Sequence, residues 1–149
     1  MEISYTQGPS GVRTVHLPSH ADSRGVLTVV ETNDDVPFAV KRIFYIYRLE
    51  PPFERGAHAH SETEQFVICV AGCMKVDVSD GMRSGTYVLN DPAVGLYIPA
   101  MIWTRLHAFT YDAVCVVVAS THYDDTEVIR SWQTYCDLVD SRRQVASCL

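Results

Sequence analysis

The chain has 149 residues, of which 47% are hydrophobic and 20% charged, and its mean hydropathy is zero. This composition excludes a disordered chain, and no apolar run approaches the roughly 20 residues that a membrane-spanning helix needs. The net charge of −6 argues against a general nucleic-acid surface. Five cysteines with no CxxC pair are typical of a reduced, cytoplasmic protein. We therefore expect one globular domain over residues 1–149.

Alternating apolar and polar residues predict short β-strands through most of the chain. The pattern is clearest at Cys73–Ser79, and turn signals such as Asp80-Gly81 separate the segments. Many short strands between regular turns indicate an all-β jelly roll or barrel, with a core from about residue 12 to residue 120. The predicted strands are Val12–Leu17, Val26–Thr32, Ala39–Arg48, Glu64–Val70, Cys73–Ser79, Thr86–Leu89, Gly95–Ile98, Thr104–Phe109 and Ala113–Ser120.

One helix is predicted near the end of the chain, at about residues 126–139. Asp125 or Thr126 can cap its first turn. Apolar residues then recur at helical spacing and form a stripe that can pack on the sheets. This stripe contains Val128, Ile129, Trp132, Tyr135, Cys136 and Val139.

Functional residues are concentrated in one segment, Arg55–Gln65. His58 and His60 are two positions apart, so on a strand they project from the same face. With Glu64 and the following Gly72 they form an HxHxxxE pattern that resembles the first motif of the cupin superfamily. Many cupins bind a metal through these three residues and a later histidine. A two-histidine, one-carboxylate metal site is therefore one alternative.

The later histidine of the cupin pattern is absent. In the corresponding segment, Pro99–Thr104, the ligand position is Thr104, and His107 is expected on the opposite strand face. Without a metal, two imidazoles on one face suit proton transfer, because either can act as base or acid near neutral pH. Arg55 can stabilise an oxyanion or hold a phosphate, and Tyr45 can add a hydroxyl donor. A pair of histidines without a chemical role is the structural alternative.

Longer segments resemble a particular branch of cupins, the FdtA-like and WxcM-like nucleotide-sugar 3,4-ketoisomerases. The resemblance covers roughly residues 22 to 132, and its most specific elements are RGxHAH and a GLYI sequence followed by Trp103. The matching segments are Asp22–Gly25, Pro37-Phe38, Lys41-Arg42, Tyr45-Ile46, Arg55–His60, Glu64-Gln65, Asp80-Gly81, Gly95–Ile98, Trp103, Ala119-Ser120, Tyr123-Asp124 and Ile129-Arg130.

The resemblance implies a metal-independent isomerase without a cofactor. It implies conversion of dTDP-4-keto-6-deoxyglucose to a dTDP-3-keto-6-deoxyhexose through an enediolate, for 3-amino-3,6-dideoxysugar biosynthesis. It implies a homodimer with no nucleic-acid or membrane partner. His60 is the expected base, with His58, Tyr45 and Arg55 as further catalytic residues, and the two histidines can exchange roles. The expected substrate-binding residues are Arg24, Glu64, Trp103 and Thr104.

Thr104 is a departure from this family, whose members often carry His or Arg after the tryptophan. A hydroxyl does not titrate at neutral pH, so both galacto and gluco products stay open. Arg105 or His107 can compensate if a bulge alters the strand register. The alternative functions are a dTDP-sugar 3,5-epimerase, a metal-dependent dioxygenase and a non-enzymatic sugar-binding cupin.

Overall fold

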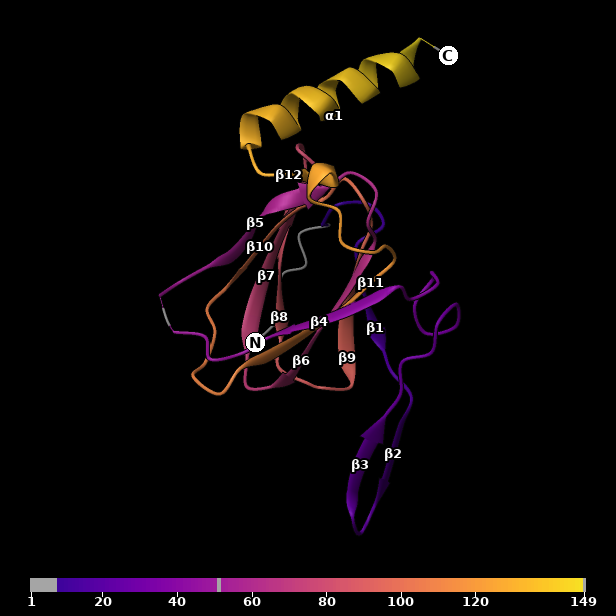
Figure 1. Ribbon diagram of the computed structural model, residues 1–149, viewed down its shortest axis with the longest axis vertical. Coiled ribbons are helices and arrows are strands. Elements are labelled where there is room, and N and C mark those ends of the chain that lie inside the picture. The colour runs from indigo at the N-terminus through magenta and orange to yellow at the C-terminus, as the bar shows by residue number, and fades with distance from the viewer. Residues whose placement is uncertain (1–7, 51, 149) are drawn as a thin grey trace.

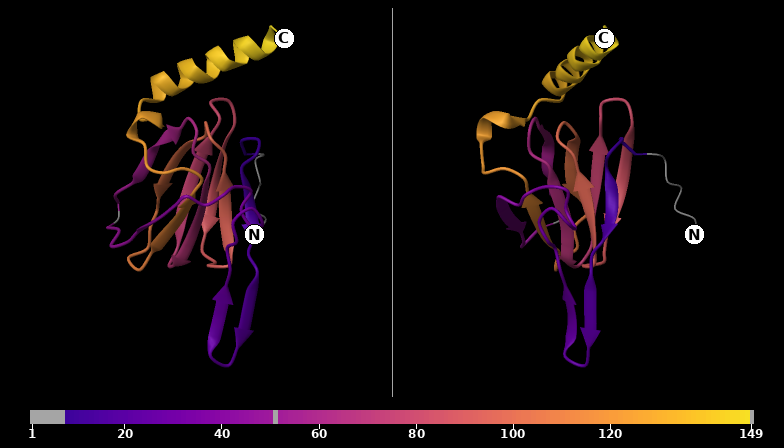
Figure 2. Two further views of the ribbon diagram at one scale, coloured as in Figure 1. Left: turned by 45° about the vertical axis from the view of Figure 1, so that its right-hand side comes forward. Right: turned by 90° about the vertical axis from the view of Figure 1, so that its right-hand side faces the viewer.

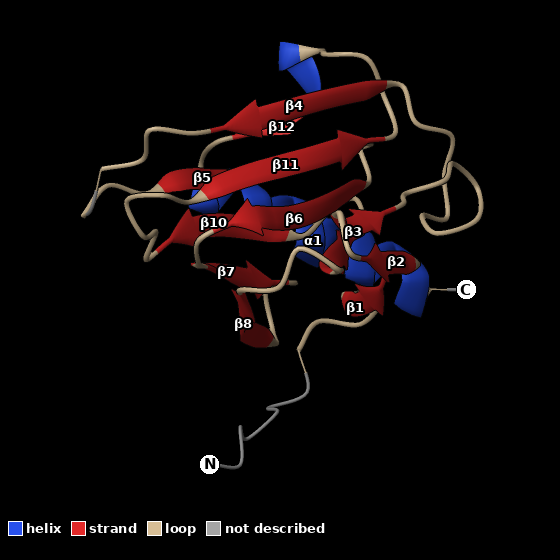
Figure 3. Ribbon diagram, turned by 90° about the horizontal axis from the view of Figure 1, so that it is seen from below, coloured by secondary structure: helices blue, strands red, loops and turns tan. Residues whose placement is uncertain are grey.

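Two five-stranded antiparallel sheets face each other and form the body of the protein (Figures 1 and 3). The structure is a computed structural model that describes residues 8–50 and 52–148. The first sheet has the order β1 (Arg13–His16), β9 (Val94–Ile98), β6 (Gln65–Ala71), β11 (Val114–Ala119) and β4 (Arg42–Ile46). The second has the order β12 (Val128–Ile129), β5 (Arg55–His60), β10 (Trp103–His107), β7 (Met74–Ser79) and β8 (Ser84–Leu89). This architecture confirms the predicted all-β jelly roll.

The alternation read from the sequence determines which side chains enter the core. In β7, Met74, Val76 and Val78 are buried while the residues between them face outward. Facing residues from both sheets, such as Val67 and Leu106, join them in one apolar cluster. The core therefore lies between the sheets, and the cavities described below open from the same interior.

The outer face of the first sheet is partly covered by the N-terminal part of the chain. Leu17, Val36 and Phe38 pack against Phe66 and other outward-facing residues of β6 and β11. As a result β6 is buried on both faces over most of its length. A strand buried on both faces has an almost continuous apolar sequence, as FVICV in this strand does.

A separate hairpin, β2 (Ser19–Asp22) and β3 (Gly25–Thr28), projects from the body on the side opposite the C-terminal helix (Figures 1 and 2). The sequence predicted a strand at Val26–Thr32 but not its partner β2. Both strands of the hairpin are exposed, with Val26 and Leu27 exposed by 70% and 60%. Two apolar side chains on a projecting hairpin indicate a surface that another chain can cover.

The C-terminal helix begins and ends later than predicted. A 3₁₀ turn covers Asp125–Glu127, and helix α1 runs from Trp132 to Ser147 with Ser131 as its N-cap. Between them, Val128 and Ile129 are extended because they pair with β5 as strand β12. These β-branched residues fit the pleated sheet, so their apolar character belongs to a strand and not to the helical stripe. Among the described residues, no helix is long and apolar enough to span a bilayer.

Candidate active site

His58 and His60 lie on β5 and face the interior between the sheets. A β-bulge precedes them, where Gly56 and Ala57 both have positive φ values of 88° and 52°. The bulge adds one residue to β5 and so shifts the alternation of its side chains. Arg55 consequently lines the same cavity as His58, although three positions separate them. The structure therefore places Arg55 beside the cavity of His58.

The two imidazole rings contact each other directly. Their Nε2 atoms are 3.2 Å apart, and the amide nitrogen of Gln65 is also 3.2 Å from His60 Nε2. Two ring nitrogens at this distance need a proton between them, so the protonation states of His58 and His60 are coupled. Burial is the main cause that lowers the pKa of His58 below its ordinary value, and this favours the neutral imidazole.

A buried carboxylate, Glu127, occupies the other side of His60. Glu127 Oε1 lies 2.5 Å from His60 Nδ1 and accepts a hydrogen bond of 2.7 Å from the Thr63 hydroxyl. Glu127 Oε2 accepts hydrogen bonds from the backbone N–H groups of Glu62 and Thr63. Burial by itself raises the pKa of Glu127, but these hydrogen bonds outweigh burial and hold the pKa below its ordinary value. Glu127 is therefore ionised and favours a proton on His60 Nδ1.

Neither Glu127 nor Gln65 was predicted from the sequence as a catalytic or binding residue. Glu127 is 67 positions from His60 and belongs to no local motif. It reaches the site because β12 pairs with the end of β5, where Val128 lies opposite His60. Gln65 directly follows the motif glutamate, and its side chain faces the opposite side of β6. Only the strand pairing reveals either residue.

Two adjoining cavities meet at the histidine pair. The inner cavity, of about 240 Å³, lies between the sheets and is lined by Arg55, His58 and Thr104 among others. The outer cavity, of about 330 Å³, is lined by both histidines and by residues of β4 and the β12 region. His58 and Gln65 line both cavities, whereas His60 lines only the outer one. Thr104, which the sequence predicts to bind substrate, lines the inner cavity with His58.

Arg42 adds a positive charge to the outer cavity. Its guanidinium carbon is 5.5 Å from the ring centre of Phe44 and 5.4 Å from that of Tyr123. Its Nε and Nη1 atoms are shielded from solvent and have no hydrogen-bond partner among residues 8–50 and 52–148. A partly buried cation without a carboxylate partner favours binding of an anionic group. The sequence indicated only that Lys41 or Arg42 faces the cavity, and the structure selects Arg42.

Tyr45 and Glu64 lie on the faces of their strands that point away from the cavities, which corrects their predicted placement. Tyr45 is 65% exposed and its ring lies 5.8 Å from that of Tyr47. Glu64 accepts a 2.5 Å hydrogen bond from the Tyr97 hydroxyl on the outer side of the first sheet. Adjacent residues of a strand face opposite sides of the sheet. The residues that face the cavities are therefore the sequence neighbours of Tyr45 and Glu64, and not these two residues themselves.

The alternative metal site does not fit this arrangement. Its third ligand would be Glu64, but Gln65 is the residue of β6 that contacts His60. A neutral amide is a poor substitute for the carboxylate of a two-histidine, one-carboxylate triad. Within residues 8–50 and 52–148, no group of three or more His, Cys, Asp or Glu side chains is arranged to hold a metal ion.

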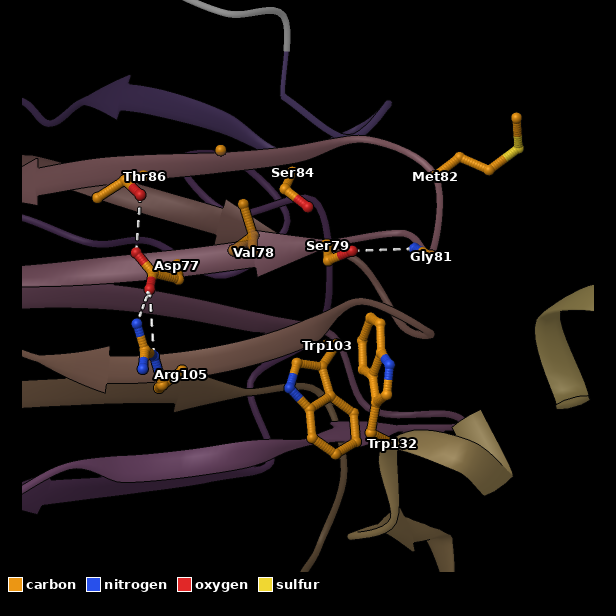
Figure 4. A pocket seen from close by; sticks show the side chains of 11 residues that line it. Asp77, Val78, Ser79, Gly81, Met82, Ser84, Thr86, Trp103, Arg105 and Trp132 are labelled. Carbon is orange, nitrogen blue, oxygen red and sulfur yellow. Dashed lines mark hydrogen bonds and ion pairs between the residues drawn. The ribbon is translucent and has the colours of Figure 1, made fainter. Parts of the chain in front are cut away.

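Trp103 also lies outside the histidine site. Its ring is 5.2 Å from Trp132 and 5.6 Å from Tyr135, so it supports helix α1. It lines a separate groove of about 720 Å³ on the outer face of the second sheet, and Figure 4 shows it there beside Trp132. Trp103 and Thr104 are neighbours on β10, so their side chains point to opposite faces of the sheet. Thr104 faces the cavities, and the indole of Trp103 therefore points away from them.

Arg105 and His107 face this outer side as well and bind Asp77. Arg105 Nη2 is 2.5 Å from Asp77 Oδ2, and His107 Nε2 is 2.8 Å from Asp77 Oδ1. A bulge does occur in β5 opposite this part of β10, but it leaves both side chains outside. Neither residue therefore compensates for Thr104 in the inner cavity.

Arg24 lies at the turn between β2 and β3, and this hairpin projects from the body on the side opposite helix α1 (Figure 1). Its side chain is 87% exposed and pairs with Asp22. The predicted contact of Arg24 with substrate is therefore not made within a single copy of this chain.

Residues 10–140 match the sequence profile of the FdtA family, described as WxcM-like, C-terminal. A curated TDP-4-oxo-6-deoxy-α-D-glucose 3,4-oxoisomerase from Aneurinibacillus thermoaerophilus is 37% identical over 123 residues, which cover 83% of this chain and 88% of the relative.

Two solved structures have the same fold at similar identity. A sugar 3,4-ketoisomerase from Thermoanaerobacterium thermosaccharolyticum, solved in complex with TDP, is 35% identical with a TM-score of 0.87, covering 89% of this chain and 97% of its own. A TDP-quinovose 3,4-ketoisomerase from Campylobacter jejuni is 36% identical with a TM-score of 0.84, covering 87% and 99%. The chain therefore belongs to the FdtA, or WxcM-like, family of the cupin fold.

Proposed function

We propose that this chain is a sugar 3,4-ketoisomerase that converts TDP-4-keto-6-deoxyglucose to a TDP-3-keto-6-deoxyhexose. One observation carries the proposal: the coupled pair of His58 and His60, backed by a buried carboxylate, opens into cavities at the end of a jelly roll. The relatives reported above, which are 35–37% identical, act on this class of substrate according to their names. The product would supply a reaction that adds an amino group at C3.

The isomerisation is balanced within the substrate. A base removes the proton at C3, and the electron pair forms an enediolate across C3 and C4. A proton then returns to C4 as the carbonyl forms at C3, while the hydroxyl proton of O3 is lost and O4 takes up a proton to become the new hydroxyl. The reaction therefore needs a base, an acid and a positive group near the developing oxyanion. It needs no external oxidant or reductant, and a metal-independent mechanism without a cofactor is part of the proposal.

The histidine pair supplies the base and the acid. His58 lines both cavities, and burial keeps it neutral, so we assign it to contact with the sugar. His60 lies between His58 and Glu127, so it is placed to exchange the proton with His58. The sequence predicted His60 as the base but left open that the two histidines exchange roles. We take the exchanged assignment, in which His58 removes the proton at C3.

Positive charge is available on both sides of the pair. Arg55 lines the inner cavity and is assigned to the enediolate, whereas the unpaired Arg42 lines the outer cavity and is assigned to the diphosphate. Planar guanidinium groups suit both kinds of oxygen. Thr104, 8% exposed in the inner cavity, is assigned to the sugar. Its hydroxyl does not titrate, so the proton at C4 must come from the histidines.

A homodimer in a cytoplasmic, reducing location completes the proposal. The exposed hairpin with Val26 and Leu27, and the exposed Ile43 and Tyr45 on β4, are apolar surfaces that a second copy can cover. In such a dimer the hairpin can bring Arg24 to the cavity of the other copy. The five free cysteines support the reducing location.

Proton NMR of TDP-4-keto-6-deoxyglucose with the protein in D₂O tests this function. We expect a 3-keto product with deuterium at C4. The same reaction in H₂O keeps a proton at C4, and its coupling to H5 identifies the galacto or gluco epimer. His58→Asn and His60→Asn should each slow turnover on the order of 100-fold or more. Deuterium only at C3 and C5 would favour the 3,5-epimerase, and binding without turnover would favour a sugar-binding protein.

A further inference from the structure

The carboxylate of Glu127 accepts hydrogen bonds from several groups besides His60. Four donors converge on its carboxylate: His60 Nδ1, the Thr63 hydroxyl, and the backbone N–H groups of Glu62 and Thr63. The residue is only 8% exposed and ionised. The backbone donors belong to the chain that leaves β5, so the carboxylate is held in one position against the ring of His60.

From this convergence we infer that Glu127 is a positioning residue that keeps a proton on His60 Nδ1 and thereby keeps His60 Nε2 free to exchange a proton with His58. The inference rests on the proposed function for its catalytic meaning. When the pair takes up the C3 proton, one imidazole becomes imidazolium, and the ionised carboxylate stabilises that charge. When the proton returns to C4, the pair is neutral again, so protons balance over one cycle.

Replacement by glutamine should reverse this arrangement. The two backbone N–H groups cannot turn away, so the amide oxygen of a glutamine must face them and its NH₂ group must face His60. An NH₂ group donates and does not accept, so His60 Nδ1 must then lose its proton and accept. The proton of His60 moves to Nε2, where it blocks proton transfer from His58.

Nitrogen-15 NMR of labelled histidines in the ligand-free protein tests the inference directly, because it reports which ring nitrogen carries the proton. We expect His60 protonated at Nδ1 in the unaltered protein and at Nε2 in Glu127→Gln. Glu62→Gln is the matched control, since the Glu62 side chain is exposed and only its backbone N–H contacts Glu127. An unprotonated Nδ1 in the unaltered protein would overturn the inference without any variant.

Steady-state kinetics separate positioning from simple structural support. We expect Glu127→Gln to lower kcat by roughly 10²- to 10⁴-fold while TDP affinity stays within about twofold, with partial recovery in Glu127→Asp. The acid limb of the kcat profile should move to lower pH, because loss of the carboxylate weakens proton binding by the pair. Other charged groups near the pair, Arg42, Arg55 and Arg130, are unchanged in this comparison.

The two proposals fail in different ways. If the unaltered protein does not turn over TDP-4-keto-6-deoxyglucose but the tautomer of His60 reverses in Glu127→Gln, the proposed function is wrong and the role of Glu127 in holding the proton stands. If the protein turns over this substrate and Glu127→Gln keeps both kcat and the acid limb, the inference about Glu127 is wrong.

Discussion

Arg42 is a cation near the histidines, and it has no ion pair with a carboxylate among residues 8–50 and 52–148. Its charge is held between Phe44 and Tyr123, and two of its nitrogens lack partners among the described residues. Leaving charged donors unsatisfied costs about 1–3 kcal/mol or more, and a bound phosphate would remove that cost. Such an arrangement favours ligand binding over the stability of the free protein.

We therefore expect Arg42→Gln to weaken TDP binding by about 10- to 100-fold, as measured by isothermal titration calorimetry. The free energy of unfolding should change little or rise, because an uncompensated buried charge is removed. Lys41→Gln is the matched control, since Lys41 is exposed on the neighbouring position of the chain. Equal loss of affinity in both variants would show that net charge, and not the site, is responsible.

A buried hydroxyl, that of Tyr135, helps to attach helix α1 to the sheets. The Tyr135 hydroxyl lies 3.0 Å from the Ser79 carbonyl oxygen and 2.9 Å from that of Met101. Burial raises the pKa of Tyr135 to about 12, so the phenol stays protonated and can donate. Its ring packs on Trp103, which connects the helix to the strand that also carries Thr104.

Tyr135→Phe should lower the free energy of unfolding by about 1–2 kcal/mol, because two carbonyl oxygens lose their shared donor. Urea denaturation measures this value. Tyr111→Phe provides the control, since Tyr111 is 83% exposed. An unchanged midpoint for Tyr135→Phe would show that water replaces the hydroxyl at no cost.

The outer face of the second sheet has a charge cluster centred on Asp77. Burial by itself raises the pKa of Asp77, but hydrogen bonds from Arg105, His107 and Thr86 outweigh it and lower the pKa below its ordinary value. A lowered pKa in the folded state means that the ionised form stabilises the fold. This contribution is complete above the pKa of the unfolded chain and is lost as the pH falls through the lower folded value.

Asp77→Asn should therefore lower the free energy of unfolding at pH 7 by about 1–3 kcal/mol, and the difference should shrink below about pH 4. Urea denaturation at a series of pH values measures both effects. Asp112→Asn, at an exposed position, should show neither. A difference that persists unchanged at low pH would mean that the amide alters packing and that charge is not the cause.

The distribution of apolar surface over the described residues supports the proposed dimer. The hairpin is exposed on both strands, and Ile43 and Tyr45 on the edge strand β4 are exposed by 62% and 65%. A monomer rarely leaves two such apolar surfaces uncovered.

We expect the unaltered protein to be a dimer by light scattering coupled to size-exclusion chromatography. Val26→Asp or Ile43→Asp should shift it toward monomer, because either substitution places a charge in the apolar contact. Met82→Asp, in an exposed turn outside this surface, should leave the dimer intact. A monomeric unaltered protein would contradict the dimer and with it the contribution of Arg24 to a second copy's site.

The sequence by itself determined the strand-rich fold, the family and the central chemical pair. Strand alternation is a local property of period two, so it places His58 and His60 on one face and identifies the core residues of β7 without any tertiary information. The RGxHAH element is also a local feature, because its residues are contiguous, and it therefore identified the family without tertiary information.

Only the tertiary structure decided which other residues join the pair. Glu127 arrives through the pairing of β12 with β5, and Gln65 replaces Glu64 because a shift of one position reverses the face of a strand. The same alternation turned Tyr45 and Trp103 outward, and a bulge turned Arg55 inward. Contacts between distant segments and the register of each strand depend on how the sheets pair, and a local pattern contains neither.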